Sequence, residues 1–240
     1  MAFAKTIHFI KTCASIFIDF FTDLHCIECG ADLEHGEYGV CQKCINDKNL
    51  FNRMLVQHKG NWIEKKLYGI TRVQVASALM MYEKGTVSQE LIHKLKYSGY
   101  RKIAITLGHA IGNNIINNNR YGHIDYIVPV PLHHKKKTIR SYNQSEEIAV
   151  NIAEIIDASV ITDNLIRKNE GKSHASSSFE ERIMSQGNFY VKDPDFFESK
   201  SILLVDDVFT TGSTIIDCCK AFNSVQNITI YVYTASAVIV

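Results

Sequence analysis

The sequence lacks a strong excess of charge of either sign. Its 240 residues carry 26 Lys and Arg against 25 Asp and Glu, a formal net charge of +1. This balance argues against a protein whose whole surface coats a polyanion, so any contact with nucleic acid needs a local basic patch. With 46% hydrophobic and 21% charged residues the chain is globular, either one large domain or one domain with a small appendage.

No apolar run is suited to crossing a membrane. The strongest candidate, residues 6–21, is interrupted by Lys11 and Asp19, falls short of a bilayer span, and is not followed by a small-residue cleavage site. Its apolar residues instead recur at helical spacing. We therefore expect an amphipathic helix over residues 1–22 that packs on the chain's own body, without stable membrane insertion. Weak docking to a membrane or a partner is the alternative.

The cysteines do not suit a secreted disulfide framework, because there are seven of them and four form two CxxC pairs. A reducing cytoplasm is the expected location. The two pairs let four thiolates converge tetrahedrally, and Gly30 suits the tight turn that aims backbone N–H groups at sulfur. A site of four thiolates is closed, so we expect a structural Zn²⁺ ribbon over residues 23–50. Its four predicted ligands are Cys26, Cys29, Cys41 and Cys44.

A strand followed by an anion-binding turn is predicted over residues 201–222. Ile202 to Val205 form an apolar run typical of a buried parallel strand, and the acidic pair Asp206 and Asp207 follows it. A turn of four hydroxyl residues around a glycine then leads into a helix, and such a turn offers backbone N–H groups to a phosphate. The turn consists of Thr210, Thr211, Gly212, Ser213 and Thr214. No Lys follows the glycine, so this is not a Walker loop.

Strands alternate with helices over most of residues 51–240. Short strands are expected around Leu67 and from 73 to 82, a helix from 102 to 116, and further strands at 124–130, 189–191 and 228–233. This order predicts a parallel sheet with helices on both faces and ligands at the carboxyl edge. The strand at 124–130 runs into a proline-stiffened loop that is expected at that edge.

Two groups of basic residues have open interpretations. A cluster directly after the proline loop contains Lys135, Lys136, Lys137 and Arg140, and it is either a solvated charge run or a functional patch. Lys94 and Lys96, on a predicted helix, are expected on a solvated face.

The motifs taken together resemble the ComF family of competence-associated proteins. In order they are CxxCG and CxxC, LKYSGY at 95–100, VPVPL at 128–132, RSYNQ at 140–144, and LLVDDVFTTGST at 203–214. The last motif is similar to the signature with which type I phosphoribosyltransferases bind 5-phosphoribosyl 1-diphosphate (PRPP). The resemblance implies an α/β type I phosphoribosyltransferase fold over residues 51–240, behind the zinc ribbon, and a role in taking up or processing transforming DNA.

The resemblance also implies roles for individual residues. Asp206 and Asp207 would bind the ribose 2′ and 3′ hydroxyls, and residues 210–214 would hold the 5′-phosphate, with Mg²⁺ accompanying PRPP. Arg140, with the nearby lysines, would cover the pyrophosphate. The pyrophosphate loop would comprise Val128, Pro129, Val130 and Pro131, and a flexible loop would comprise Arg140, Ser141, Tyr142, Asn143 and Gln144. The chain departs from the family pattern at Ser141, usually Gly, and at His174, usually Gln.

Three functions remain in play because the sequence identifies no acceptor for phosphoribosyl transfer. The first is a PRPP-binding protein of DNA uptake whose zinc ribbon and Lys135–Lys137 contact single-stranded DNA. The second is an active phosphoribosyltransferase. The third is an interaction module that docks a competence helicase or another uptake component.

Overall fold

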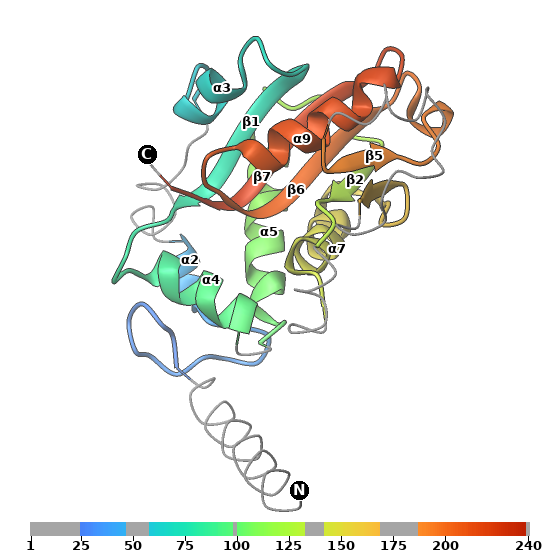
Figure 1. Ribbon diagram of the computed structural model, residues 1–240. Coiled ribbons are helices and arrows are strands. Elements are labelled where there is room, and N and C mark those ends of the chain that lie inside the picture. The colour runs from blue at the N-terminus through green and yellow to red at the C-terminus, as the bar shows by residue number, and fades with distance from the viewer. Residues whose placement is uncertain (1–24, 47–57, 98–99, 133–141, 169–186, 239–240) are drawn as a thin grey trace, which may run out of the picture.

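The computed structural model describes residues 25–46, 58–97, 100–132, 142–168 and 187–238. Its centre is a five-stranded sheet in the order β1-β7-β6-β2-β3, in which every neighbouring pair is parallel (Figure 1). The five strands are β1 (Val73–Met81), β2 (Tyr126–Pro129), β3 (Ser159–Val160), β6 (Ser201–Phe209) and β7 (Thr229–Ala237). Two further strands, β4 (Leu165–Arg167) and β5 (Phe189–Val191), form a separate antiparallel pair.

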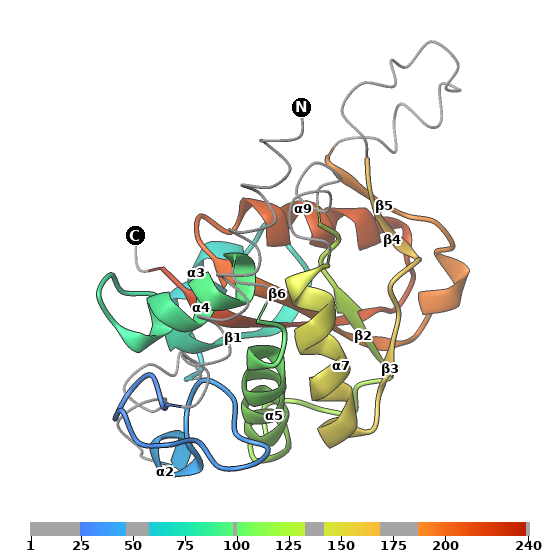
Figure 2. The same ribbon diagram turned by 90° about the horizontal axis from the view of Figure 1, so that it is seen from below.

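Helices cover both faces of the sheet, as Figure 2 shows for α9 on one side and for α5 and α7 on the other. The helices are α2 (Gln42–Asn46), α3 (Trp62–Leu67), α4 (Val87–Tyr97), α5 (Ile103–Ile116), α7 (Gln144–Ile156) and α9 (Ser213–Ala221), with short 3₁₀ turns η1 (Asp195–Phe197) and η2 (Phe222–Ser224). The predicted α/β class, a parallel sheet flanked by helices behind a four-cysteine segment, is confirmed.

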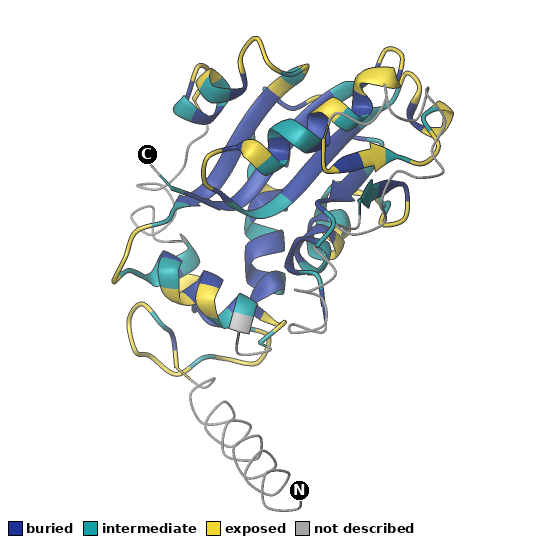
Figure 3. Cartoon of the chain, in the orientation of Figure 1, coloured by how far each residue is buried: buried dark blue, intermediate teal, exposed yellow. Residues whose placement is uncertain are grey.

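Alternation along β6 divides the core into two layers, because successive side chains of a strand point to opposite faces. Leu203 and Val205 pack with side chains of α5 and α7, whereas Ile202 and Leu204 pack with α3 and α9. All strands of the sheet except the short edge strand β3 are buried along most of their length (Figure 3). Burial on both faces explains the continuous apolar runs in the sequence.

Two glycines let α5 and α7 pack closely. A Cβ atom added at Gly108 would lie 2.5 Å from Asn151 Cβ, and one added at Gly112 would lie 2.6 Å from Ile155 Cβ. Both separations are shorter than carbon atoms tolerate, so larger residues would push the helices apart. The close pair holds α7, whose first turn reaches the carboxyl edge of the sheet, against the body.

Two local predictions are wrong. Leu67 lies in helix α3 and not in a strand, because the Asn61 side chain accepts hydrogen bonds from the backbone N–H groups of Ile63 and Glu64, at 2.9 and 3.0 Å, and so caps a helix. The central strand does not end at Val205, because β6 stays paired with β7 as far as Phe209 and Ala237. The predicted helix at 102–116 is confirmed by α5.

Candidate functional site

The acidic pair lies near the carboxyl end of β6, the middle strand of the sheet. Asp206 is in register with Thr234 of β7, and both carboxylates are largely shielded from solvent. A cavity of about 460 Å³ opens beside them. Its lining comes from the carboxyl ends of four parallel strands, from the first turn of α7, from α4 and from β4. In an open α/β sheet this edge is where ligands bind.

The two carboxylates have different partners. Lys96 of α4 places its Nζ atom 3.0 Å from Asp207 Oδ2, and both side chains are more than four-fifths buried. Asp206 Oδ1 accepts hydrogen bonds from Ser145 Oγ at 3.0 Å and from the Asp207 backbone N–H at 2.9 Å. The prediction that Lys96 lies on a solvated face is therefore wrong, because the helix turns this residue toward the site.

Asp206 is the residue of the site whose protonation is most affected. Burial, and secondly the negative charge of Asp207, raise the pKa of Asp206 to about 7. The hydrogen bonds from Asp207 N–H and Ser145, together with the charge of Lys96, act in the opposite direction without cancelling the rise. Two adjacent carboxylates in a sheltered position thus attract cations and hydroxyl donors.

The turn from Thr210 to Thr214 joins β6 to α9 and reaches the same cavity. Gly212 has a φ of +84°, and a Cβ atom there would lie 2.7 Å from Phe209 Cζ, so glycine is required for both conformation and space. Thr210 and Thr214 line the cavity, and the first turn of α9 contains no acidic residue. The helix N-terminus therefore offers backbone N–H groups and a favourable dipole to an anion.

The proline loop after β2 forms another part of the wall. Val130, Pro131 and Leu132 line the cavity, whereas Val128 and Pro129 lie within β2, where they are buried in the sheet. The Asn143 side chain donates a hydrogen bond from Nδ2 to the Val130 carbonyl at 3.0 Å and accepts one from the Ser145 N–H at 3.2 Å. Asn143 thus caps α7 and fixes the loop at the same time.

Tyr142 and Gln144, expected in a flexible loop, occupy packed positions. The Tyr142 hydroxyl donates a hydrogen bond to the Leu95 carbonyl of α4, and the Arg101 guanidinium lies 4.4 Å from the centre of its ring. Gln144 is buried in the first turn of α7 and lines the cavity. The hydrogen bond of Tyr142 joins the segment that leads into α7 to helix α4. The other loop residues, Arg140 and Ser141, lie outside the described residues.

Other sequence predictions also fall outside the described part of the chain. These are the helix over residues 1–22, the basic residues Lys135, Lys136 and Lys137, and the family departure at His174. The structure does not test these predictions.

Several cavity residues were not predicted as site residues from the sequence. Ser145 and Lys96 contact the acidic pair directly, while His93 of α4, Tyr82 after β1 and Arg167 of β4 line the cavity. None belongs to the acidic motif, and each is brought to it by the crossing of the chain. The sequence held two usable signals. Lys96 lies within the LKYSGY motif at 95–100, and Tyr82 ends the strand predicted from 73 to 82, at the edge where ligands bind.

The four cysteines of the predicted ribbon converge. Their Sγ atoms all lie within 4.8 Å of one another, and those of Cys29 and Cys41 are 3.8 Å apart. A tetrahedral Zn²⁺ ion with Zn–S bonds of about 2.3 Å separates its sulfur ligands by about 3.8 Å, so the donor set fits zinc. The Cys41 N–H donates to Cys26 Sγ at 3.3 Å. His25 pairs instead with Asp32 at 2.8 Å.

The electrostatics of the cluster suit a thiolate site. Burial raises the pKa of Cys26, but backbone N–H groups, chiefly that of Cys41, outweigh it and bring the value to about 7. Burial and the neighbouring thiols raise the pKa of Cys44. A bound cation would resolve this crowding by holding all four sulfurs as thiolates.

The four-cysteine segment packs on α4, which borders the cavity, and on the neighbouring α5. Gly39 has a φ of +74°, and a Cβ atom added there would lie 3.2 Å from side-chain carbons of both Leu91 and Ile103. The Thr106 hydroxyl donates to the Tyr38 carbonyl at 2.7 Å. Cys26, Cys41 and Cys44 belong to the core cluster that contains the buried residues of α4 and α5. The four-cysteine segment therefore supports the helix that carries Lys96.

Within the described ranges, no helix is both long and apolar enough to cross a bilayer.

Comparisons with known proteins give relatives at modest identity. The chain is 23% identical over 214 residues to Competence protein F of Haemophilus influenzae, which covers 83% of this chain and 91% of that protein. It is 28% identical over 137 residues to DNA utilization protein YhgH of Salmonella typhi, which covers 54% of this chain and 58% of the relative. The same figures hold for the Salmonella typhimurium protein of that name.

Among solved structures, the chain is similar to a hypoxanthine phosphoribosyltransferase from Staphylococcus aureus. The TM-score is 0.35 and the identity 13%, over 65% of this chain and 82% of that one. No protein-family model matches. The relatives named for competence and DNA utilization confirm the resemblance to the ComF family.

Proposed function

We propose that this ComF-like protein binds PRPP, together with Mg²⁺, in the cavity at the carboxyl edge of its sheet. One observation carries the proposal: an acidic pair, a glycine turn and a helix N-terminus follow one another on the chain and open on one cavity. A diol, a phosphate and a divalent cation are the partners that this combination suits. The volume of about 460 Å³ lies in the range of small-molecule sites.

Each wall of the cavity has a part in this proposal. Asp206 and Asp207 accept hydrogen bonds from the ribose hydroxyls, and residues 210–214 bind the 5′-phosphate through backbone N–H groups and hydroxyls. The loop at Val130 and Pro131 faces the pyrophosphate. Bound Mg²⁺ would supply charge neutralisation between phosphate oxygens and the acidic pair. Lys96 pairs with Asp207 and, through this ion pair, joins α4 to the acidic pair at the opening.

We further propose that the four-cysteine cluster holds a structural Zn²⁺ ion. The sulfur separations support this, and so does the closed donor set, which leaves no position for a substrate. The ion would fix residues 26–44 on α4 and α5 without entering any chemistry at the PRPP cavity.

The cellular role that we propose is in DNA uptake, in the cytoplasm, alongside a helicase or another uptake component. The names of the curated relatives support this role, and the chain aligns with nearly the whole length of one of them. Transfer of the phosphoribosyl group to an acceptor is the second candidate. It is favoured by Arg167 and His93, two further side chains of the cavity lining that offer hydrogen-bonding groups to an acceptor.

Calorimetric titration with PRPP, with and without Mg²⁺, tests the ligand proposal. We expect binding that requires Mg²⁺ and that weakens at least a hundredfold in the double variant Asp206→Asn and Asp207→Asn. The matched control is Asp163→Asn with Asp195→Asn, which removes two exposed carboxylates of equal charge. Absence of binding to the wild-type protein at millimolar PRPP refutes the proposal. So does a double variant that binds PRPP as well as the control does.

A further inference from the structure

A second concave surface lies at the opposite edge of the sheet, between α3 and the start of β1. This groove, of about 770 Å³, is lined by twelve of the residues between Lys59 and Val75 and by Arg120, which precedes β2. It lies at the amino ends of the parallel strands, whereas the PRPP cavity lies at their carboxyl ends. In Figure 1, α3 lies beside β1, away from α4. The two sites therefore share no lining residue.

The charge exposed by the groove is of one sign. Lys59, Lys65 and Arg72 are exposed, and none of them makes an ion pair with any described residue. The single acidic residue of the lining, Glu64, is already satisfied: it pairs with Arg120 and accepts the backbone N–H groups of Gly60 at 2.7 Å and Ala76 at 3.1 Å. Internal neutralisation of Glu64 leaves three cations facing solvent, in a chain whose net charge is only +1.

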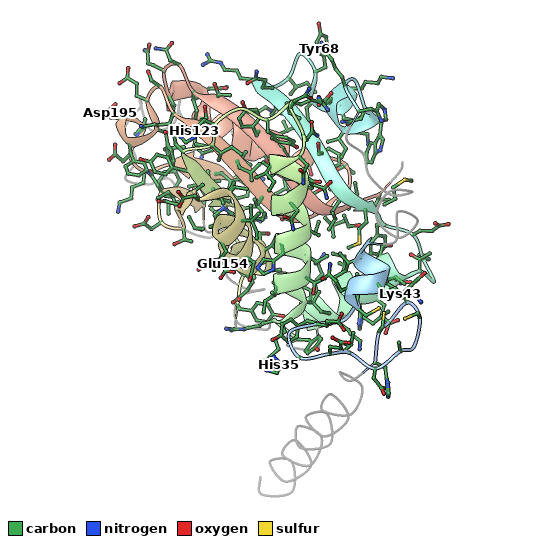
Figure 4. The ribbon with its side chains drawn as sticks, turned by 180° about the vertical axis from the view of Figure 1, so that it is seen from behind. His35, Lys43, Tyr68, His123, Glu154 and Asp195 are labelled. Carbon is green, nitrogen blue, oxygen red and sulfur yellow. The ribbon has the colours of Figure 1, made fainter. Side chains whose placement is uncertain are left out.

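The same groove is lined by an aromatic side chain that is almost fully exposed to solvent. Tyr68 is 88% exposed, and Figure 4 shows it pointing away from the body of the protein. Its backbone is nevertheless fixed, because the Tyr68 N–H donates to the Glu64 carbonyl at 2.8 Å and ends α3. Ile70, two residues on, is also 51% exposed. Aromatic rings normally bury most of their surface, so an anchored and exposed ring suggests a face that a ligand covers.

We propose that this groove, defined by Lys59, Lys65, Tyr68 and Arg72, binds single-stranded nucleic acid. Cations along a groove follow a phosphate backbone, and an exposed aromatic ring stacks on bases of any sequence. A duplex keeps its bases stacked internally and offers no free base to Tyr68. A protein partner with an acidic surface would use the cations but gain little from the stacking geometry. The proposal stands on the groove itself and does not depend on PRPP binding.

The size of the effect follows from the number of contacts. Each phosphate contact with a single strand contributes about 0.7 to the slope of log K against log salt concentration, so loss of the two lysines lowers the slope by about 1.4. Stacking of one base on an aromatic side chain contributes about 1–3 kcal/mol, which corresponds to a loss of about 5-fold to 150-fold when the ring is removed. Together these values predict two separable signatures.

Fluorescence anisotropy of a labelled 20-nucleotide oligo(dT) with the full-length protein, at 50 and 200 mM salt, measures both signatures. The first variant is Lys59→Gln with Lys65→Gln, matched by Lys192→Gln with Lys220→Gln, two exposed lysines outside both sites. The second is Tyr68→Leu, matched by Tyr190→Leu on β5, which is 43% exposed. All of these side chains lie on the surface, so each variant should fold, and its melting temperature verifies this.

We expect the groove lysine pair to weaken binding about tenfold at 50 mM salt and to flatten the salt dependence. Tyr68→Leu should weaken binding at least fivefold without changing the slope, and the controls should match the wild type. Absence of binding at 50 mM salt overturns the proposal, as does equal affinity of groove and control variants. Loss with the lysines but not with Tyr68→Leu also overturns it, because it indicates a site for polyanions in general. PRPP titration of the same variants should be unchanged.

Discussion

Replacement of Asp206 by Asn should stabilise the protein above pH 7, although the residue lies at the centre of the candidate site. Burial and the charge of Asp207 raise the pKa of Asp206 to about 7 in the folded protein, against an ordinary value of 3.8. Because the folded pKa is the higher one, the folded state binds this proton more tightly than the unfolded chain does. The resulting stabilisation is fully present below about pH 4 and is lost as the pH rises to about 7.

The magnitude follows from the same difference. A pKa change from 3.8 to about 7 corresponds to at most about 4 kcal/mol of folding free energy above pH 7. The variant's Oδ1 atom keeps the hydrogen bonds from Ser145 and the Asp207 N–H, but its amide NH₂ group needs a new acceptor. We therefore expect a gain of about 2 kcal/mol at pH 8, or about 4–8 °C in Tm for a chain of this length.

Thermal melts from pH 5 to pH 8.5 in Mg²⁺-free buffer test this expectation, with Asp163→Asn as the control for an exposed carboxylate. The gain of Asp206→Asn over wild type should be largest at pH 8 and should shrink toward pH 5. Lys96→Met should act in the opposite direction at pH 8, since it removes the cation beside Asp207. Parallel profiles for wild type and Asp206→Asn, or a lower Tm of the variant at pH 8, would show that the site does not strain the two carboxylates.

Two further predictions concern the supports of the site. Gly212→Ala should lower the stability by about 2–3 kcal/mol, because it adds a contact at 2.7 Å with Phe209 to the strain of a positive φ. Gly85→Ala, at a similar φ of +78° but with no neighbour within 4 Å, should lower it by about 1 kcal/mol. Chemical denaturation compares the two variants, and equal losses of stability would contradict the steric argument. Purified protein should contain one Zn²⁺ per chain, and Cys29→Ser should lose the ion and melt at a lower temperature. Cys219→Ala, which changes a buried cysteine outside the cluster, should retain it. Metal analysis of the three proteins measures this, and zinc retained by Cys29→Ser would argue against the four-thiolate site.

The parts of the candidate site that are contiguous in the chain were predictable from the sequence. The run from Asp206 to Thr214 combines a strand end, an acidic pair, a glycine turn and a helix start within a few residues, so local conformation alone brings these groups together. The cysteine cluster was predictable for the same reason, because two CxxC pairs close in sequence have few other arrangements. Alternating strands and helices with buried-type apolar runs were enough to predict the α/β class.

Tertiary structure alone decided which distant side chains complete the site. Lys96 precedes Asp207 by more than a hundred residues, and only the packing of α4 beyond the sheet, supported by the four-cysteine segment and by Tyr142, places its charge on that carboxylate. A helical lysine has the same local pattern whether it faces solvent or a cavity. For this reason its expected position was wrong.

The same division applies to the groove at the amino edge. The sequence shows lysines, a tyrosine and a glutamate. It does not show that Glu64 pairs with Arg120 and accepts hydrogen bonds from two backbone N–H groups, or that the Tyr68 side chain is exposed to solvent. Local order along the chain determined the class of fold, the acidic motif and the thiolate cluster of this protein. Exposure, pairing of charges and strand order depend on contacts between segments far apart in the chain, and these were fixed only when the sheet and its helices packed together.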